Sequence, residues 1–376
     1  MFSSNDHQFM AHALRLAERG LYTTDPNPRV GCVIVREGVI VGEGWHERAG
    51  EPHAEVNALH DAGSQAKGAT AYVTLEPCSH HGRTPPCAEA LIAAGVSKVV
   101  AAMIDPSPKV AGKGMQILQD AGIETASGLM EAQARELNPG FIRRYESSRP
   151  YVRCKLAMSL DGRTALANGE SKWITSDAAR ADVQRLRARS SVIVTGIGTV
   201  MADDPRMNPR VDSYVDAPVL QPDRVVLDSS LKMPTQAAML ALEGNTWVAT
   251  CSDDVTKRQL LEQAGARLMT LPRGNGGGVS LETLLKQLSQ LQYNELLVEA
   301  GPVLSGAFLQ AGLLDEIVIY MAPHILGDGA RGLFQLPLLE DMQQRVALEI
   351  KELRQVGTDL RLTLKTQPDK TCLQEL

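Results

Sequence analysis

The chain has 376 residues, of which 44% are hydrophobic and 22% charged, with a formal net charge of −6 at pH 7. This length exceeds the roughly 100–200 residues of a typical domain, so two domains are expected. The acidic balance argues against a nucleic-acid partner, because neutralising phosphates calls for a surplus of Lys and Arg. No apolar run approaches the roughly 18 residues of a transmembrane helix, so no membrane association is expected.

The cysteine content points to a reducing compartment. The six cysteines are few for this length and are not spaced like the disulfide framework of a secreted protein. Residues 1–7 are polar and lack the apolar stretch of a signal peptide. Both features predict a cytoplasmic protein.

Helix and strand patterns alternate through the first half of the chain. An apolar stripe over residues 9–17 predicts a helix, and two strand-like runs around the Glu37-Gly38 turn predict a β-hairpin. The strands are expected at residues 30–35, 39–45, 69–75 and 98–104, and further helices at residues 52–63, 87–94 and 114–121. This alternation is typical of an α/β layer with parallel strands.

Between residues 53 and 87 the sequence carries the side chains of a catalytic zinc site. His53, Cys78 and Cys87 offer one imidazole and two thiols, and a catalytic zinc uses three protein ligands and keeps one position for water. Zinc lowers the pKa of bound water to about 7, so that the water can attack a ring carbon at neutral pH. Glu55 is the predicted proton shuttle, because zinc deaminases combine His-x-Glu with a later Pro-Cys.

Two other interpretations of these residues stay open. His80 or His81 could serve as a fourth ligand and make the site structural, or the residues could bind no metal at all. Structural sites often draw on paired C-x-x-C units, and the sequence has none here, so a catalytic site is favoured. Eight residues separate Cys78 from Cys87, whereas the general deaminase pattern has two.

The longer insert leads to a specific resemblance. The run from Thr74 to Cys87 resembles the deaminase half of RibD, a family of bifunctional riboflavin-biosynthesis enzymes, and residues 25–31 and 49–55 match the same family. The resemblance implies a cytidine-deaminase-like three-layer α/β/α domain over residues 1–146. It also implies hydrolytic deamination of a diaminopyrimidinone ribosylamine 5′-phosphate.

Residues outside the zinc motif gain roles from this resemblance. Asn27 and His46 would contact the pyrimidine ring of the substrate, and Arg83 its phosphate. An arginine beside the metal can form a charge-assisted pair with a phosphate, although a solvated loop charge is the alternative. Ser107 departs from the family, which commonly has Asn there; its hydroxyl could still form a hydrogen bond with the substrate.

A short polar segment from Glu146 to Pro150 predicts a domain boundary near residue 146. A second β/α series begins beyond it, with a helix expected at residues 176–189 and a closing antiparallel pair at residues 346–353 and 360–364. Other strands are expected at residues 151–158, 192–195, 224–227, 246–250, 296–299 and 317–321.

Two glycine turns in this half have the form of phosphate-binding turns. Gly196-Ile197-Gly198 follows a strand, but Met201 replaces the last small residue of a dinucleotide fingerprint, so that interpretation is rejected. The segment from Val298 to Pro302 combines a strand end, a glycine turn and a helix start, where free N–H groups can bind an anion. An ordinary strand-to-helix turn is the alternative.

Residues 155–164 and 299–302 resemble the reductase half of the same family. This resemblance implies a dihydrofolate-reductase-like α/β domain over residues 147–376 that uses NADPH. The cofactor would lie near Ala157, Trp173, Thr199, Asp203, Ser229, Gly301, Pro302, Val303, Leu304, Ser305, Gly306 and Ala307. The ribosyl substrate would lie near Ser171, Arg187, Met207, Arg210 and Glu299.

These patterns predict a bifunctional enzyme in which zinc-dependent deamination precedes reduction of the ribosyl group to ribityl by NADPH. The sequence of the second half does not indicate which residue donates the proton. The alternatives are a zinc deaminase of another nucleotide whose second half only binds a ligand, and a zinc-stabilised module without catalysis. The family resemblance also favours a homo-oligomer, a dimer or a tetramer, with small pyrimidine ribosyl phosphates as substrates.

Overall fold

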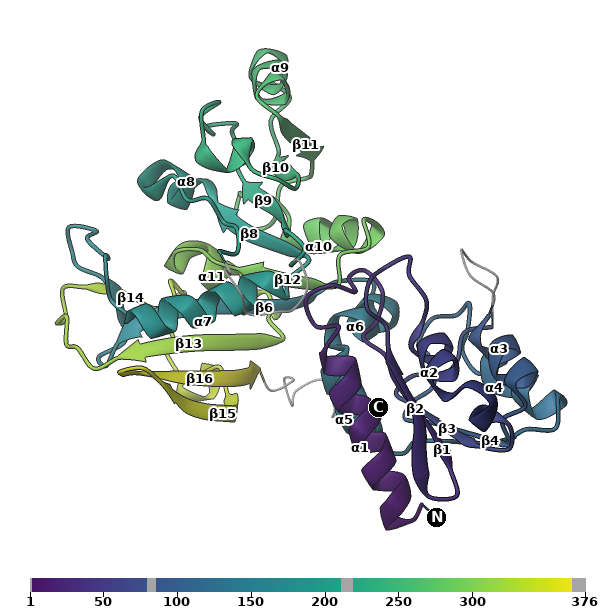
Figure 1. The fold of residues 1–376 in the computed structure, drawn as a ribbon. Coiled ribbons are helices and arrows are strands. Elements are labelled where there is room, and N and C mark those ends of the chain that lie inside the picture. Colours follow the sequence, from purple (N-terminus) through teal and green to yellow (C-terminus); the bar gives the residue numbers. More distant parts are fainter. Residues whose placement is uncertain (1, 80–85, 211–218, 367–376) are drawn as a thin grey trace. The chain divides into compact units, whose positions relative to one another are not determined.

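The computed structural model describes residues 2–79, 86–210 and 219–366 (Figure 1). The chain divides into two compact units: the first covers Met1–Arg149 and a short later segment that ends at Leu220, and the second covers the other residues from Pro150 onward. Each unit has its own sheet and its own buried apolar core. Each therefore has the features of a separate domain.

The sheet of the first unit is mixed and has the order β2-β1-β3-β4-β5. Strand β1 (Gly31–Arg36) is antiparallel to both of its neighbours, whereas β3, β4 and β5 are parallel to one another. The other strands are β2 (Val39–Trp45), β3 (Thr70–Val73), β4 (Lys98–Ala101) and β5 (Glu124–Ser127). The predicted hairpin is confirmed, but the expectation of parallel strands holds for only part of the sheet.

Glycines in the hairpin let two helices pack closely on opposite faces of this sheet. A side chain at Gly31 would place its Cβ 2.0 Å from the carbonyl oxygen of Ala13 in α1 (Ser4–Glu18). At Gly44 the Cβ would lie 2.4 Å from the carbonyl oxygen of Ala54, where α2 (Ala54–Ala62) begins. Gly44 pairs with Cys32, the neighbour of Gly31, so the two glycines face opposite ways. The first unit therefore has helix, sheet and helix layers.

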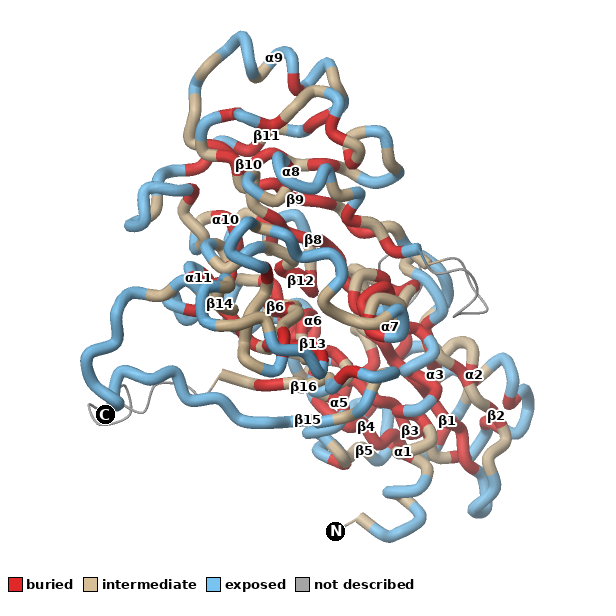
Figure 2. The backbone as a smooth tube through the Cα atoms, turned by 90° about the vertical axis from the view of Figure 1, so that its left-hand side faces the viewer, coloured by how far each residue is buried: buried red, intermediate tan, exposed pale blue. Residues whose placement is uncertain are grey.

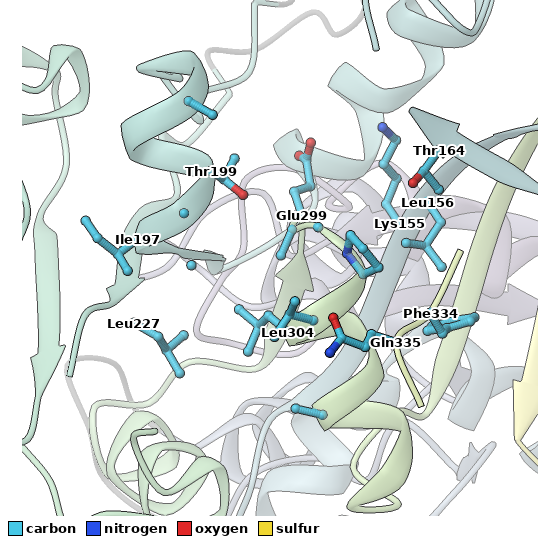
Figure 3. Close-up of a pocket in the computed structure, with 18 of the residues that line it drawn as sticks. Lys155, Leu156, Thr164, Ile197, Thr199, Leu227, Glu299, Leu304, Phe334 and Gln335 are labelled. Carbon is cyan, nitrogen blue, oxygen red and sulfur yellow. The ribbon is translucent and has the colours of Figure 1, made fainter. Parts of the chain in front are cut away.

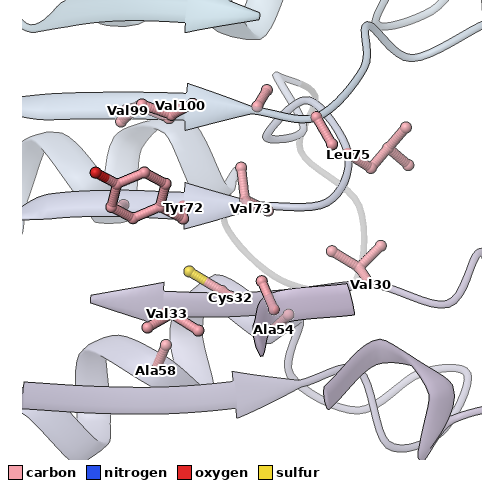
Figure 4. Close-up of a cluster of buried hydrophobic side chains, with 14 of the residues drawn as sticks. Val30, Cys32, Val33, Ala54, Ala58, Tyr72, Val73, Leu75, Val99 and Val100 are labelled. Atoms are coloured by element: carbon pink, nitrogen blue, oxygen red, sulfur yellow. The ribbon is translucent and has the colours of Figure 1, made fainter. Parts of the chain in front are cut away.

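Where α2 packs on the sheet, small and β-branched side chains fill the core (Figure 4). Cys32, Val73 and Val99 from three neighbouring strands are fully buried, together with Ala54 and Ala58 of α2. Alanine on the helix matches glycine on the strand, because the close approach of the two backbones leaves no room for larger side chains. This packing fixes the N-terminus of α2 against the sheet.

Among the described residues, the first unit has four further α-helices and one 3-10 turn. They are α3 (Cys87–Ala94), α4 (Lys113–Asp120), α5 (Glu131–Leu137), α6 (Pro139–Ser147) and the 3-10 turn Gly63–Ala66. The predicted bounds of α3 are confirmed, whereas α2 begins at Ala54 and not at Pro52. Strand β5 and helices α5 and α6 were not predicted. Helix α6 ends at Ser147, one residue past the predicted boundary at 146.

Within the described residues, the sheet of the second unit has nine strands in the order β11-β10-β9-β8-β12-β6-β13-β16-β15. All pairs from β11 to β13 are parallel, and β16 is antiparallel to β13 and β15, so the predicted closing pair is confirmed. The strands are β6 (Tyr151–Ser159), β8 (Val192–Gly196), β9 (Asp223–Leu227), β10 (Thr246–Thr250), β11 (Ala266–Thr270), β12 (Glu295–Val298), β13 (Glu316–Ala322), β15 (Leu348–Val356) and β16 (Asp359–Thr366). A separate small sheet pairs β7 (Arg163–Ala165) with β14 (Arg331–Gly332).

Helix α7 (Asp177–Ala188) confirms the predicted helix of this unit, and its N-cap is Ser176, whose side chain accepts from the Ala179 N–H. The other helices within the described residues are α8 (Ile197–Asp203), α9 (Val255–Gln263), α10 (Leu281–Gln290) and α11 (Pro302–Gln310), with 3-10 turns at Ala238–Ala241 and Met342–Gln344. Of these, only α11 was predicted.

Burial follows the layers of each unit (Figure 2). The central strands of both sheets are mostly buried, whereas β15, at one edge of the larger sheet, is largely exposed. Among the described residues, no helix combines the length and the apolar character needed to cross a membrane.

Candidate active sites

His53, Cys78 and Cys87 converge in the first unit. Nδ1 of His53 lies 3.2 Å from Sγ of Cys87 and 3.6 Å from Sγ of Cys78, and the three ligand atoms all lie within 4.8 Å of one another. Ligand atoms of one tetrahedral zinc ion are about 3.3–3.8 Å apart, given bonds of about 2.0–2.3 Å. The donor set and its spacing therefore fit zinc, and the structure brings together all three predicted ligands.

Two of the three ligands lie at the starts of helices, whereas Cys78 lies in the irregular segment after β3. His53 is the N-cap of α2 and makes no capping hydrogen bond with its side chain, so the ring is available to a metal. Cys87 is the first residue of α3, and its N–H donates to Sγ of Cys78 over 3.2 Å. The positive end of a helix stabilises thiolates, so this arrangement favours the charged form of the ligands.

The two cysteines differ in their protonation before any metal binds. A hydrogen bond from the Cys87 thiol lowers the pKa of Cys78 to about 4, with a further contribution from His53. The same hydrogen bond raises the pKa of Cys87. The hydrogen bond thus favours the thiolate form of Cys78, and binding of both sulfur atoms to zinc would release the proton that lies between them.

Glu55 lies beside these ligands in the first turn of α2 and is only 3% exposed. Burial raises the pKa of its carboxyl group to about 7, against the opposing attraction of His53. The carboxyl group also forms a hydrogen bond with Cys87. A carboxyl group with a pKa near neutrality can both accept and give a proton, which is what a proton shuttle must do.

Asn27 and His46 form one hydrogen-bonded unit next to the ligands. The His46 ring meets the His53 ring edge-on, with centroids 5.2 Å apart. Nδ1 of His46 lies 3.1 Å from the Pro52 carbonyl oxygen, and Nε2 lies 3.1 Å from the amide nitrogen of Asn27. Burial lowers the pKa of His46, so Nδ1–H donates to Pro52 and Nε2 accepts from Asn27. Both ring nitrogens of His46 are thus engaged within the protein. Of these two side chains, Asn27 is therefore the one whose remaining polar atoms, its carbonyl oxygen and second N–H, can bind a ligand.

The remaining residues predicted for this site differ in how far the structure describes them. Arg83 and the alternative zinc ligands His80 and His81 lie outside the described residues. Ser107 is buried, 5% exposed, and its N–H donates to the Asp105 carboxylate over 2.7 Å. Asp105 lies close to Glu76 and Cys78, so this segment and Ser107 with it lie near the zinc ligands. Burial, together with the charges of Glu76 and Cys78, raises the pKa of Asp105 to about 6.

The second unit contains a cavity of about 2160 Å³ at the carboxyl ends of its parallel strands. Typical sites for small ligands are about 300–1,000 Å³, so this cavity has room for a dinucleotide and a second molecule. The predicted cofactor residues that line it are Ala157, Trp173, Thr199, Asp203, Ser229, Gly301, Pro302, Val303, Leu304 and Ala307. The predicted substrate residues that line it are Ser171, Arg187, Met207, Arg210 and Glu299.

Two residues predicted to contact the cofactor face the core instead of the cavity. Ser305 is fully buried, and its hydroxyl lies 3.4 Å from the carbonyl oxygen of Ala300. Gly306 packs against the chain at Gln335, where a Cβ would lie 2.2 Å from the carbonyl oxygen. Both residues lie on the face of α11 that turns away from the cavity, which a contiguous stretch of sequence cannot reveal.

Gly306→Ala should therefore lower stability and not act through cofactor contacts. The added methyl group has to displace the backbone at Gln335, and overpacking of this kind costs about 1–3 kcal/mol. Gly301→Ala is the matched control, because nothing lies within 4 Å of its Cβ and its φ of −70° suits alanine. Thermal unfolding of both variants checks this, and equal melting temperatures would contradict it.

A charged cluster projects into the cavity from β6 and from the end of β12 (Figure 3). Arg187 of α7 joins this cluster: its Nε and Nη2 lie 2.6 and 2.9 Å from the two carboxylate oxygens of Glu299. Burial raises the pKa of Glu299, but the ion pair with Arg187, helped by Lys155 and Arg210, outweighs it, and the net pKa is below its usual value. Glu299 is therefore a carboxylate held in a fixed orientation.

Lys155 belongs to this cluster and was missing from the predicted site. It lies next to Thr164 at the cavity wall (Figure 3), and burial lowers the pKa of its ammonium group, opposed by Glu299. The sequence feature that could have identified Lys155 is its place within the apolar strand over residues 151–158. Strands buried on both faces rarely carry a charged side chain unless it has a partner or a function.

The cavity as a whole favours anionic ligands. Cationic side chains outnumber acidic ones two to one among its described lining residues: Lys155, Lys172, Arg180, Arg187, Arg206, Arg210, Arg273 and Arg331 against Asp203, Asp204, Glu282 and Glu299. Gly301 begins α11 without a side-chain cap, so the first N–H groups of that helix are available as well. Phosphorylated ligands fit such a surface.

Comparison with known proteins agrees with both sites. Residues 3–103 match the cytidine and deoxycytidylate deaminase zinc-binding region, and residues 150–362 match the RibD C-terminal domain. Riboflavin biosynthesis protein RibD of Escherichia coli (strain K12) is 52% identical over 96% of this chain and 99% of its own length.

Solved structures agree over the same length. Acinetobacter baumannii RibD, form 1, is similar with a TM-score of 0.91 at 49% identity, covering 97% of this chain and 99% of its own. A diaminohydroxyphosphoribosylaminopyrimidine deaminase/5-amino-6-(5-phosphoribosylamino)uracil reductase from Thermotoga maritima has a TM-score of 0.84 at 30% identity, covering 96% and 99%.

One chain thus joins two enzymes, a zinc-dependent deaminase in the first unit and a reductase in the second. The protein belongs to the RibD family, the bifunctional deaminases and reductases of riboflavin biosynthesis. Zinc is the cofactor of the deaminase half and NADPH that of the reductase half. The predicted fold class, a cytidine-deaminase-like α/β domain followed by an α/β reductase domain, is confirmed.

Proposed function

We propose that the chain converts 2,5-diamino-6-ribosylamino-4(3H)-pyrimidinone 5′-phosphate into 5-amino-6-ribitylamino-uracil 5′-phosphate in two steps. In the first, water replaces an amino group of the pyrimidine and ammonia leaves. In the second, a hydride from NADPH and a proton open the ribosyl ring to ribityl. The observation that carries the proposal is the convergence of His53, Cys78 and Cys87 beside the buried carboxyl group of Glu55.

In the deaminase half, His53, Cys78 and Cys87 would hold the zinc ion, which supplies an acidified water for attack at the ring carbon. Glu55 accepts a proton from the attacking water and delivers it to the leaving amino group, as its pKa near 7 allows. Asn27 orients the pyrimidine with its carbonyl oxygen or its second N–H, and His46 holds the Asn27 amide in place. Arg83 is proposed for the substrate phosphate on the resemblance alone.

In the reductase half, the carboxylate of Glu299 orients the ribosyl hydroxyl groups by accepting their hydrogen bonds. Arg187 fixes that carboxylate through two hydrogen bonds, and Lys155 adds a donor at the same point of the cavity. The free N–H groups at the start of α11 and the cationic wall suit the phosphates of NADPH. Met207 offers an apolar contact from within the same cavity.

The proposed domains are residues 1–146 for deamination and 147–376 for reduction. Two compact units that meet at Arg149 and Pro150, and family matches that end at 103 and begin at 150, support this division. A homo-oligomer and a cytoplasmic location stay predictions.

A single assay tests the proposal. Zinc-loaded protein is given the diaminopyrimidinone phosphate and NADPH, and ammonia release and NADPH absorbance are followed together. Ammonia release should come first, and NADPH oxidation should depend on the deaminated product. Ammonia release without any NADPH oxidation would instead identify a deaminase whose second half only binds a ligand.

Removing zinc should separate the two activities. Treatment with a chelator is expected to abolish ammonia release, because the attacking water is no longer acidified. The rate of NADPH oxidation with deaminated substrate should stay unchanged, since the described residues that line the reductase cavity include no cysteine. Restoring zinc is the control. Deaminase activity that survives complete zinc removal would contradict the assignment of the ligands.

A further inference from the structure

A buried carboxylate lies two residues before the second zinc ligand, Cys78. Glu76 is 3% exposed, and each of its oxygens accepts two backbone N–H groups from one segment of the chain. Oε2 accepts from Gly112 at 2.8 Å and from Asp105 at 3.1 Å. Oε1 accepts from Gly114 at 2.9 Å and from Met115 at 3.3 Å. None of the steps described above uses this carboxylate.

Glu76 takes the place of the missing cap of helix α4. Gly112 is the N-cap of α4 and has no side chain to accept the N–H groups of the first turn. Those of Gly114 and Met115 are satisfied by Glu76, which comes from a distant part of the chain. A negative charge is also favourable at the positive end of a helix. The carboxylate therefore binds the start of α4 to the segment that leaves β3.

A second contact joins the same two segments at the next residue. A Cβ at Gly114 would lie 1.9 Å from the carbonyl oxygen of Pro77, so only glycine allows this approach. Pro77 is the residue between Glu76 and the ligand Cys78. The start of α4 is thus pressed against the peptide that carries Cys78.

The zinc ligand Cys78 is therefore held between two helix starts. On one side α4 fixes Glu76 and Pro77. On the other side α3 donates the N–H of Cys87 to Sγ of Cys78 over 3.2 Å, and the N–H of Ala88 to the Cys78 carbonyl oxygen over 3.2 Å. Releasing either side leaves the sulfur anchored by one helix only.

We propose that Glu76 is a positioning residue of the zinc site, which fixes Sγ of Cys78 relative to His53 and Cys87 by anchoring α4 to the peptide before Cys78. The inference rests on the proposed function only in taking these three residues as the zinc ligands. It adds a residue that contacts neither the ligand atoms nor the reacting groups. Residues that hold metal ligands in place commonly change metal affinity by about 10- to 100-fold when they are replaced.

Glu76→Gln in the full-length protein tests this. The amide keeps one acceptor oxygen and places an NH₂ group against backbone N–H groups, so at least two of the four hydrogen bonds are lost. Zinc transfer to a chromophoric chelator should become about 10- to 100-fold faster, and the thiolate absorption bands of the cobalt-substituted protein should shift. Reduction of deaminated substrate by the same chain should keep its rate, which shows that the second unit is intact.

Two further variants keep the test decisive. Gly114→Ala pushes the start of α4 away from Pro77 and should also speed zinc release. Asp120→Asn, on the exposed side of α4, is the control and should release zinc at the wild-type rate. If Glu76→Gln does not yield a folded first unit, Gly114→Ala decides by the same measurement: faster release supports the proposal and wild-type release overturns it.

The outcomes separate this inference from the function on which it rests. If His53→Ala leaves zinc binding of the protein unchanged, the ligand assignment fails and with it the proposed deaminase site. If His53→Ala abolishes zinc binding but Glu76→Gln keeps the wild-type release rate and cobalt spectrum, the ligand assignment stands and Glu76 is not a positioning residue.

Discussion

Glu55→Gln is expected to lower the deaminase kcat by at least about a hundredfold without loss of zinc, because proton transfer by a placed carboxyl group contributes about 10²–10⁴ in rate. The amide has nearly the shape of the carboxylic acid but cannot take up or deliver a proton. Burial already favours the neutral form of Glu55, whose pKa is raised to about 7. The neutral amide should therefore fit the site without a large cost in stability.

Three measurements check this expectation. Ammonia release gives the kcat, metal analysis gives the zinc content, and NADPH oxidation with deaminated substrate shows whether the second half still works. Glu18→Gln, an exposed position of α1, is the matched control and should change none of them. Full deaminase activity in Glu55→Gln would rule out Glu55 as the proton shuttle, and loss of zinc would show that it acts on the metal instead.

The zinc site was predictable because its chemistry demands particular residue types at the ends of elements. A proline-led turn before His53 and another before Cys87 indicated two helix starts, and the structure has a helix start at each. Glu76 was not predictable in this way. Its partners lie between 29 and 39 residues further along the chain and are backbone groups, so no pattern of residue types marks them.

In the sheets, too, features set by neighbouring residues were predicted, whereas features set by residues far apart in the sequence were not. Residues 39–45 were predicted as a strand because they follow the Glu37-Gly38 turn of a hairpin, and β2 has these bounds. Strand β11 and helices α9 and α10 were missed, although Leu284, Leu285 and Leu288 of α10 are fully buried. Antiparallel pairing of β1 with β3 depends on contacts across more than 30 residues, which the periodicity of a single segment does not report.

The residues of the reductase cavity could be predicted only in part. Resemblance placed fifteen of its predicted residues on the cavity wall, ten for the cofactor and five for the substrate. Ser305 and Gly306 are not among the residues that line it, because a helix turns successive residues to different sides. Lys155 was missed because its role arises only when β6 and β12 lie side by side and bring it close to Glu299.

Glu299→Gln should reduce the reductase kcat/KM by roughly thirtyfold or more, because removing one partner of a buried ion pair costs about 2–5 kcal/mol. Arg187 would keep one of its two hydrogen-bond acceptors, and the cationic groups Lys155 and Arg210 would lose the carboxylate that offsets them. The ribosyl hydroxyl groups would also face an amide that donates as well as accepts.

The control and the readout follow from the same cavity. Glu282→Gln removes another carboxyl group from the cavity wall, but an exposed one, and should change kcat/KM by less than about threefold, as expected of exposed charges. Ammonia release should be unchanged in both variants. If Glu299→Gln reduces the deaminated substrate at the wild-type rate, the charged cluster at Arg187 and Glu299 serves stability alone, and the ribosyl group must be oriented by other residues of the cavity.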